Sequence, residues 1–571
     1  MLTRLVVRRF KLFEDVEIPL GNPVVFIGPN NSGKTAALQA LSLWDAGLKR
    51  WLEKRGGRKT PEKRTGVAIN RRDLVSVPVP DAKLLWRALR VRDHDGNSGT
   101  RNIRVEIIVD GIGQEGQWTC GLEFDYANEE SIYCRPLGLS DTGGDQSSAI
   151  PPEAAQLRVT FLPPMSGLAA NETRLDPGAI NVRLGEGRTN EVLRNICYQV
   201  LTGADGPVKW AAIRERTKAL FGVVLDDPVY VSDRGELTMS YRDRRGTQLD
   251  LSSAGRGLHQ TLLVLAHIAA NPDSVLLLDE PDAHLEILRQ RQMYHELTRA
   301  AVGQKSQIVI ASHSEVVLNE AADRDVVVAF VGHPHRIDDR GSHLLKSLKE
   351  IGFDQYYQAE QVGWVLYLEG STDLAILKSF ASTLGHSAMS ALERPFVYYV
   401  ANLPTKAREH FHGLREAKEN VVGLALFDNG VRLQESRDLV ERMWGRREIE
   451  NYLCYPDTLL AWARAEGAKV LGPMFATIWE DAMRESMKEV ERAATTILQR
   501  SPWDPQTKVS DEFLSPLFAD FYRRLGLPNL MLKSDYHILA QFVSRDRVDG
   551  EVTAVLDAIS EVAGRAQPEQ D

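Results

Sequence analysis

Compact apolar stretches separated by polar residues or glycine predict the elements of the first 50 residues. Residues 2–10, 16–20 and 23–27 are typical of short strands, and the third leads directly into a glycine-containing loop. From Thr35 to Trp44 the apolar positions follow helical spacing. This part of the chain is therefore expected to run strand, strand, strand, loop, helix.

The hydrophobic period changes along the middle of the chain. Residues 75–135 alternate as strands do, residues 187–222 have helical spacing, and residues 228–250 are typical of a small antiparallel pair. After Leu251 helices and strands alternate, which predicts a parallel sheet covered on both faces. The expected elements there are a helix ending at residue 270, a strand at 274–278, a helix at 285–301 and a strand at 307–311.

A second α/β pattern begins near residue 362. Strands are expected at 365–368, 396–400 and 421–427 and a helix at 372–384, and the chain is mostly helical from about residue 455. We therefore expect four parts in this α/β protein. They are a first domain at 1–345 with an inserted segment at about 45–225, a second domain core at 360–455, its helical part at 456–563, and a disordered tail at 564–571.

Composition narrows the class of protein. The 571 residues are 43% hydrophobic and 26% charged, which is typical of a globular chain and excludes a fibrous or disordered one. No apolar run is long enough to span a bilayer, so we expect no membrane association. Four cysteines lie far apart without a CxxC pair, which favours a reducing cytoplasm and argues against a zinc site.

The distribution of charge bears on whether the chain binds nucleic acid. The net charge is −9, so any contact with nucleic acid must use a local basic patch. Residues 49–72 contain ten Lys or Arg and two Glu. This stretch is either a solvated helix–loop face or a phosphate-contacting surface.

A phosphate-binding loop lies between the third strand and the first helix. Residues 28–35 read GPNNSGKT and match GxxxxGK[ST] in the strand–loop–helix context that this motif requires. Backbone N–H groups of such a loop cradle phosphates, the lysine contacts the β- and γ-phosphates, and the final hydroxyl binds Mg²⁺. The expected contacts to ATP come from Gly28, Asn30, Asn31, Ser32, Gly33, Lys34 and Thr35.

Two acids end the buried strand at 275–279. Asp279 is placed to bind Mg²⁺ together with Thr35, and Glu280 is placed to polarise the attacking water. A helix-capping role for one of the two acids is the structural alternative.

The surrounding motifs resemble the ABC-type ATPases of the SMC and OLD families. Residues 251–257, LSSAGRG, resemble the ABC signature, residues 282–285 resemble the D-loop, and His313 resembles the switch histidine. The resemblance implies an ABC/SMC-type P-loop head in which His313 and Glu280 serve hydrolysis. It also implies a dimer at least, because signature residues of one subunit contact the γ-phosphate held by another. These residues are Ser252, Ser253, Gly255 and Gly257. A Q-loop glutamine cannot be assigned.

A second acidic site is expected in the second domain. Glu369 and Asp428 each follow a buried strand, and Asp373 lies one helical turn beyond Glu369. Acids at the carboxyl ends of parallel strands meet at one edge of the sheet, where they repel one another unless a cation lies between them. We therefore expect Mg²⁺ or Mn²⁺ there, with Glu369, Asp373, Asp428 and Glu450 as candidate ligands.

This second site resembles the TOPRIM domain that follows the ATPase in OLD-family nucleases. The resemblance implies a catalytic role for Glu369 and a metal-binding role for Asp428, whereas Gly430 stands where the family has a second aspartate. Glu448 and Glu450, in a segment RExENYL that resembles phage-defence nucleases, would share a face if they lay on a strand. Lys533 is either a phosphate-contacting lysine or a solvated surface residue.

The leading interpretation is a cytoplasmic ATPase–nuclease of the OLD type, resembling the anti-phage proteins of Gabija and PARIS. Its partners would be a second copy of the chain, DNA or RNA, and a second defence protein or a phage-encoded trigger. One alternative is an ATPase sensor whose degenerate TOPRIM domain recruits an effector. Another is a short-armed RecF-like DNA-repair ATPase.

Overall fold

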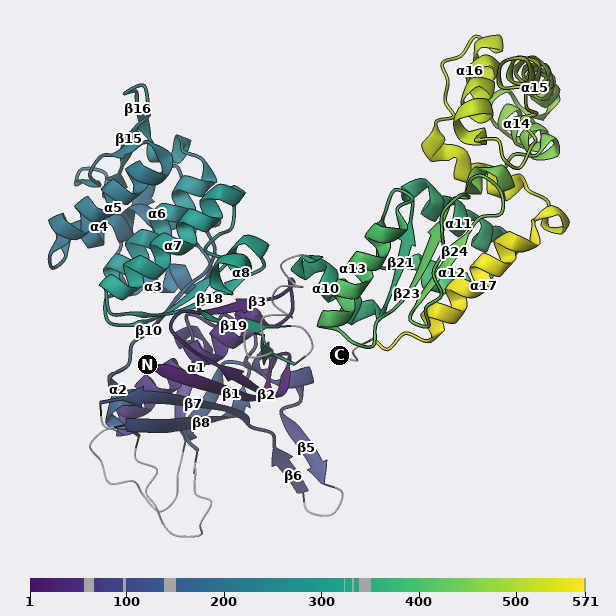
Figure 1. Cartoon of the computed structure of the whole chain (residues 1–571). Coiled ribbons are helices and arrows are strands. Elements are labelled where there is room, and N and C mark those ends of the chain that lie inside the picture. Colours follow the sequence, from purple (N-terminus) through teal and green to yellow (C-terminus); the bar gives the residue numbers. More distant parts are fainter. Residues whose placement is uncertain are drawn as a thin grey trace. The chain divides into compact units, whose positions relative to one another are not determined.

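The computed structural model describes residues 1–55, 66–95, 99–114, 116–137, 150–322, 324–330, 333–337 and 351–568 (Figure 1). It divides into two compact units, Met1–Leu345 and Lys346–Asp571, and each is described by itself. Part of the basic stretch at 49–72, residues 56–65, lies outside the described residues, as do residues 569–571 of the predicted tail.

The first unit contains a six-stranded antiparallel sheet. Its strand order is β2-β1-β7-β8-β9-β4, and its neighbours pair antiparallel throughout. The prediction of strands over 75–135 is wrong before residue 92, where short 3-10 turns η2 (Ala82–Leu85) and η3 (Arg87–Leu89) replace them. The bounds are β1 Leu2–Phe10, β2 Phe13–Pro19, β4 Val67–Asn70, β7 Val105–Gly113, β8 Gly116–Asn128 and β9 Ser131–Pro136; β5 Arg92–Asp95 and β6 Gly99–Asn102 form a separate hairpin.

A second sheet of the first unit is parallel except at one edge. Its order is β10-β17-β18-β3-β19-β20, and only β20 runs antiparallel to its neighbour. Every residue of β3, β17 and β18 is buried, as continuous apolar runs predict for strands covered on both faces. The bounds are β3 Val24–Ile27, β10 Val159–Leu162, β17 Val275–Asp279, β18 Gln307–Ser312, β19 Val326–Ala329 and β20 His335–Arg336.

Helices cover both faces of the parallel sheet (Figure 1). Helix α1 (Lys34–Arg55) packs between the two sheets and shares one hydrophobic core with both. The opposite face carries a helical layer with two small three-stranded sheets beside it. Helix α2 (Pro152–Gln156) lies beside β8 on the side of α1. The remaining helices are α3 Pro177–Gly185, α4 Leu193–Thr202, α5 Gly206–Phe221, α6 Arg256–Ala270, α7 Ile287–Gly303 and α8 Glu315–Ala321. The short strands are β11 Glu172–Thr173, β12 Val224–Leu225, β13 Val229–Val231, β14 Glu236–Thr238, β15 Ser240–Arg242 and β16 Gln248–Asp250.

The second unit is built on a four-stranded parallel sheet of order β22-β21-β23-β24. Alternate residues of β21 and β23 enter two separate cores, so the sheet is covered on both faces. Helices α11, α12 and α17 lie on one side, and α10 and α13 on the other (Figure 1). The bounds are β21 Trp364–Leu368, β22 Val397–Tyr399, β23 Val422–Phe427, β24 Leu439–Met443, α10 Phe353–Val362, α11 Ser371–Leu384, α12 Ala388–Glu393, α13 Pro404–Ala417 and α17 Gly550–Gly564.

The C-terminal part of this unit is helical, with α14 (Pro456–Leu471), α15 (Ala476–Leu498) and α16 (Ser515–Arg524) packed together. Of the tail predicted to be disordered, at 564–571, the structure describes residues 564–568. Ala566 packs against the core, and a Cβ on Gly363 would lie 2.8 Å from the Pro568 nitrogen. In the described ranges, no helix has the length and hydropathy required to cross a bilayer.

Candidate functional site

The phosphate-binding loop connects the buried strand β3 to helix α1. Asn31 and Gly33 adopt left-handed backbone angles, with φ of 65° and 102°. A Cβ on Gly28 would lie 2.7 Å from the Phe330 carbonyl oxygen, and one on Gly33 would lie 2.9 Å from the Phe13 ring. Glycine is therefore required at both positions by the close packing of the loop.

The side chains of this loop fit an anionic ligand. Lys34 is buried, and its Nζ donates to the carbonyl oxygens of Gly28 at 2.7 Å and Pro29 at 2.6 Å. Burial lowers the pKa of Lys34, while the charges of Glu280 and Asp279 act in the opposite direction. Ser32 Oγ is buried and has no hydrogen-bond partner in the part of the chain that the structure describes. An ammonium group beside an unsatisfied hydroxyl suits the phosphates of ATP.

Thr35 and Asp279 meet across the junction of α1 and β17. Thr35 Oγ1 lies 3.1 Å from Asp279 Oδ1 and 3.0 Å from Oδ2. Burial raises the pKa of Asp279 to about 6, against the Thr35 hydrogen bond, which lowers it. A hydroxyl beside a buried carboxyl provides hard oxygen ligands, so the residues present fit Mg²⁺.

Glu280 and His313 follow adjacent parallel strands, β17 and β18. Glu280 has a φ of 48°, and its N–H donates to the Ala311 carbonyl at 2.8 Å. Its Oε1 lies 3.1 Å from His313 Nδ1. The two side chains are 29% and 50% exposed, so a water molecule can reach the pair. This geometry gives a carboxylate base a histidine partner.

Two polar residues that were not predicted from the sequence, Gln260 and Ser312, fix the segment that follows β17. Gln260 Nε2 donates to the carbonyl oxygens of Glu280 at 3.3 Å and Pro281 at 3.2 Å, and Ser312 Oγ donates to Asp282 Oδ2 at 3.0 Å. Gln260 is fully buried on α6, just before the apolar run at 262–266. The sequence feature that could have identified Gln260 is a polar residue close to an apolar run, because buried polar groups need hydrogen-bond partners.

The signature-like segment forms the exposed turn that precedes α6. Asp250 Oδ1 accepts from Ser252 N at 2.8 Å and from Ser252 Oγ at 2.6 Å, and the buried Arg194 Nη2 donates to the same oxygen at 3.2 Å. Ser252 and Ser253 are exposed. Gly255 is the N-cap of α6, and a Cβ on Gly257 would lie 3.1 Å from Leu285. Asp250 and Arg194, which were not predicted, thus position the two predicted serines.

In the second unit, the structure brings Glu369 and Asp428 together. They follow β21 and β23, which pair directly. Burial and a hydrogen bond to the Glu369 carboxyl raise the pKa of Asp428 to about 9. The two carboxyl groups therefore form an acidic pair at the ends of the paired strands. Asn402 supports it, because its Oδ1 accepts from Asp428 N at 3.0 Å.

Asp373 lies beside this pair but caps helix α11. Its Oδ2 accepts from the N–H groups of Glu369 at 3.0 Å and Gly370 at 3.4 Å. Burial raises the pKa of Asp373 to about 6, and the charge of Glu369 adds to the shift. Its carboxyl therefore fixes the Glu369 backbone at the start of the helix.

Glu448 and Glu450 do not lie on a strand, which corrects the expectation that they share a strand face. They belong to the 3-10 turn η7 (Ile449–Tyr452) and its N-cap. Both are buried, and burial with the charge of Glu448 raises the pKa of Glu450 to about 8. Glu448 accepts from Ser510 N at 2.6 Å and Oγ at 3.0 Å, and Lys533 Nζ donates to that hydroxyl at 3.1 Å.

The donor set allows a two-carboxylate metal site. Among the described residues, no three His, Cys, Asp or Glu side chains are arranged to hold one ion. Glu369 and Asp428 nevertheless fit Mg²⁺, which takes one or two carboxylates and completes its shell with water and substrate phosphates. Gly430 has a φ of 105°, a conformation that an aspartate at this position could adopt only with strain.

Comparisons with known proteins match parts of this chain. The family model described as "AAA domain, putative AbiEii toxin, Type IV TA system" matches residues 212–319, which include the signature-like turn, β17 and β18. A segment of 43 residues is 46% identical to an OLD nuclease of Thermus scotoductus (strain ATCC 700910 / SA-01), and it covers 8% of this chain and 8% of that protein. The chain thus spans only a small fraction of the length of this curated relative.

Among solved structures, the chain is similar to the SMC head domain from Thermotoga maritima, with 14% identity and a TM-score of 0.32. The match covers 59% of this chain and 98% of that domain. An SMC head bound to the C-winged helix domain of ScpA matches with a TM-score of 0.36, also at 14% identity, over 59% of this chain and 98% of that one.

The fold class predicted from the sequence is confirmed. The chain is an α/β protein whose first unit has a parallel sheet with a phosphate-binding loop, followed by a second α/β unit with a helical C-terminal part. Strand β18 separates the phosphate-loop strand β3 from β17, and this order brings Lys34, Asp279 and His313 to one edge of the sheet.

Proposed function

We propose that this protein is an ATP-hydrolysing head coupled to a metal-dependent, TOPRIM-type nuclease of the OLD family that acts on DNA or RNA in anti-phage defence. The observation that carries the proposal is the acidic pair Glu369–Asp428, located at the ends of adjacent parallel strands. The same chain also has a hydrogen bond between Thr35 and Asp279, the two residues expected to bind Mg²⁺ in an ATPase.

In the head, each side chain has a separate task. Lys34 would neutralise the β- and γ-phosphates, and Thr35 with Asp279 would hold Mg²⁺, which supplies charge neutralisation when bound. Glu280 accepts a hydrogen bond from the attacking water and orients it. His313, 3.1 Å from the Glu280 carboxylate, fixes the orientation of that carboxylate.

In the second unit, Glu369 and Asp428 in their ionised forms would hold a metal ion, which when bound would supply charge neutralisation to a phosphodiester. Lys533 supports this site, because its Nζ donates to Ser510 Oγ, which in turn donates to Glu448. Burial raises the pKa of Glu448, and the charge of Lys533 acts in the opposite direction. We propose that Lys533 balances the negative charge of a bound phosphate, which is the functional alternative left open by the sequence.

A cleavage assay on the full chain tests the nuclease. The chain and its Glu369→Gln variant are incubated with ATP, Mg²⁺ or Mn²⁺, and separate pools of phage DNA, plasmid and total tRNA. We expect the parent to cleave one pool, and Glu369→Gln to lose at least about 10²-fold in rate because a metal ligand is removed. Glu393→Gln, the same change on the exposed end of α12, is the matched control and should cleave as the parent does.

ATP turnover in the same preparations tests the head. Lys34→Ala should abolish it, whereas Glu369→Gln should leave it unchanged. Cleavage that is equal in the parent and in Glu369→Gln would contradict the nuclease, and turnover that survives Lys34→Ala would contradict the ATPase.

One observation favours a second function, an ATPase sensor whose second unit recruits an effector without cleaving nucleic acid. The left-handed Gly430 replaces the second aspartate expected of a TOPRIM site. The same assay separates the two functions, since a sensor would turn over ATP and cleave none of the pools.

A further inference from the structure

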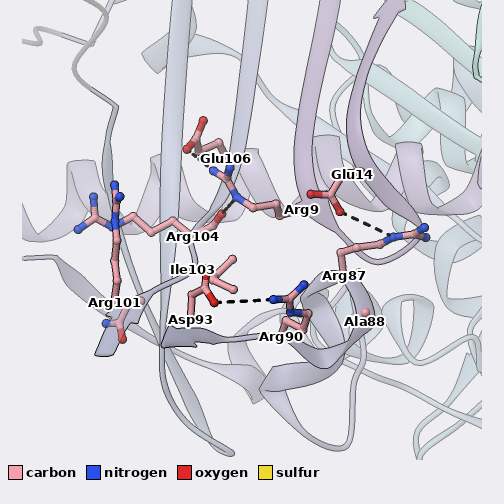
Figure 2. Close-up of a pocket in the computed structure, with 11 residues that line it drawn as sticks. Arg9, Glu14, Arg87, Ala88, Arg90, Asp93, Arg101, Ile103, Arg104 and Glu106 are labelled. Atoms are coloured by element: carbon pink, nitrogen blue, oxygen red, sulfur yellow. Dashed lines mark hydrogen bonds and ion pairs between the residues drawn. The ribbon is translucent and has the colours of Figure 1, made fainter. Parts of the chain in front are cut away.

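An arginine-rich pocket lies on the antiparallel sheet of the first unit. Its volume is about 480 Å³, within the range of small-ligand sites. Residues of β1, β6, β7 and η3 line it (Figure 2). Five guanidinium groups face three carboxylates there, in a protein whose net charge is −9. The arginines are Arg9, Arg87, Arg90, Arg101 and Arg104.

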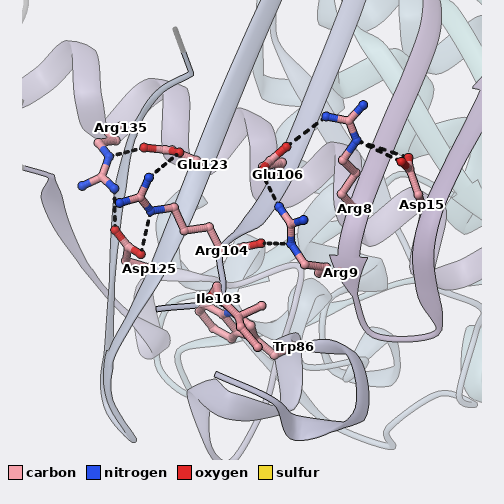
Figure 3. A network of polar contacts seen from close by, with 10 residues as sticks. All are labelled: Arg8, Arg9, Asp15, Trp86, Ile103, Arg104, Glu106, Glu123, Asp125 and Arg135. Carbon is pink, nitrogen blue, oxygen red and sulfur yellow. Dashed lines mark hydrogen bonds and ion pairs between the residues drawn. The ribbon is translucent and has the colours of Figure 1, made fainter. Parts of the chain in front are cut away.

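Two of these arginines are bound into a network that forms the wall of the pocket (Figure 3). Arg9 pairs with Glu106, and its Nε donates to the Arg104 carbonyl at 2.6 Å. Arg104 pairs with Glu123 at 3.2 Å and with Asp125 at 3.1 Å. Because these ion pairs are already formed, Arg9 and Arg104 shape the pocket but add little net charge to it.

The other three guanidinium groups are weakly neutralised. Arg87 lies 4.0 Å from Glu14 and its Nη1 donates to the Leu12 carbonyl at 2.5 Å, a neutral partner that leaves its charge uncompensated. Arg90 lies 3.8 Å from Asp93, and the four charged side chains are between 41% and 73% exposed. Such long, solvated ion pairs contribute little to stability and separate easily. Arg101 is exposed and makes no ion pair with any described residue.

The segment that carries Arg87 and Arg90 is held in a strained conformation. Ala88 and Leu89, between them, have φ of 50° and 60°, a left-handed region that such residues rarely adopt. The segment is anchored just before them, where Trp86 Nε1 donates to the Ile103 carbonyl at 2.7 Å. Backbone strain kept by its surroundings is typical of binding sites, and here it presents two arginines to one pocket.

We propose that Arg87, Arg90 and Arg101 bind the phosphate groups of a nucleotide ligand, either free or within a single strand. Guanidinium groups match phosphate oxygens with two parallel hydrogen bonds each, so three of them suit two or more neighbouring phosphates. Among the described residues, the lining offers Ile103 and Ala88 as apolar contacts and no aromatic ring for base stacking. The guanidinium groups therefore favour recognition of phosphate over stacking on the base.

Binding measurements on the full chain test this site. All variants carry Lys34→Ala, so that the phosphate-binding loop contributes little. The probes are a fluorescein-labelled single strand of about 12 nucleotides, followed by anisotropy, and inorganic pyrophosphate, followed by calorimetry. Arg87→Ala/Arg101→Ala should weaken binding by about tenfold or more for each charge removed. The matched control is Arg234→Ala/Arg245→Ala, which removes two exposed arginines of the same unit and should bind as the parent does.

The two probes distinguish the sources of phosphate. If the ligand is free, pyrophosphate binds and the strand binds no more tightly. If it is a strand, the strand binds more tightly and the slope of log K against log salt falls in the double variant by about 0.7 for each phosphate that is no longer neutralised. Binding of neither probe, or equal binding by the pocket and control variants, would overturn the proposal.

Discussion

At the scale of single residues, Asp428 makes the stability of the folded protein depend on pH. Burial and the Glu369 hydrogen bond raise its pKa to about 9, above the value of roughly 3.9 expected in the unfolded chain. Between these values the folded protein binds more protons than the unfolded one, so its stability falls as pH rises. The slope for one proton is at most about 1.4 kcal/mol per pH unit.

We therefore expect the metal-free chain to lose thermal stability from pH 6 to 9. Asp428→Asn should reduce that loss, because the amide has no proton to release and keeps a hydrogen bond to Glu369. Thermal unfolding in EDTA at several pH values measures this. Glu393→Gln, exposed on α12, is the control and should retain the parental slope. An unchanged slope in Asp428→Asn would show that the pair does not titrate in this range.

At the scale of elements, the conformation of the turn before α6 depends on one capping residue, Asp250. Asp250 accepts from Ser252 and is the partner of the buried Arg194 guanidinium. Asp250→Ala should cost about 1 kcal/mol for removal of the cap, and more because Arg194 is deprived of a partner. ATP turnover should fall as well, because Ser252 is no longer held. Asp243→Ala is the control, since Asp243 caps the neighbouring turn through Arg245 N and Thr247 N, each at 2.8 Å. Equal losses of turnover in both variants would contradict a specific role for Asp250.

The elements that sequence could predict are those whose determinants are contiguous. The phosphate-binding loop, β17 with its two acids, and the ends of β21 and β23 are each fixed by one run of residues. The interactions that sequence missed join distant segments. Ser510 meets Glu448 across 62 positions, and Arg194 meets Asp250 across 56. The arginine pocket likewise draws its lining from several strands, so no local motif marks it.

At the scale of the whole molecule, the exposed signature-like turn implies assembly. Ser252 and Ser253 are exposed at the start of α6, while Lys34 is buried in its own loop. Exposed serines held by an internal cap suit a phosphate presented by a second copy of the chain. ATP should therefore stabilise a dimer when hydrolysis is slow, as in Glu280→Gln.

Light scattering of the full chain with and without ATP tests this assembly. Glu280→Gln should double in mass with ATP, and adding Ser253→Arg should prevent it, because a bulky cation would occupy the dimer surface. ATP binding itself should persist in Ser253→Arg, since that residue is not part of the phosphate-binding loop of its own chain. A Glu280→Gln chain that keeps the same mass with and without ATP, although it binds ATP, would contradict a nucleotide-dependent dimer. ATP would then have to control the acidic site by some means other than dimerisation of the first unit. If the dimer forms, cleavage is compared in two chains that both keep Glu280. Cleavage by the parent should depend on ATP, and cleavage by the Ser253→Arg single variant should not.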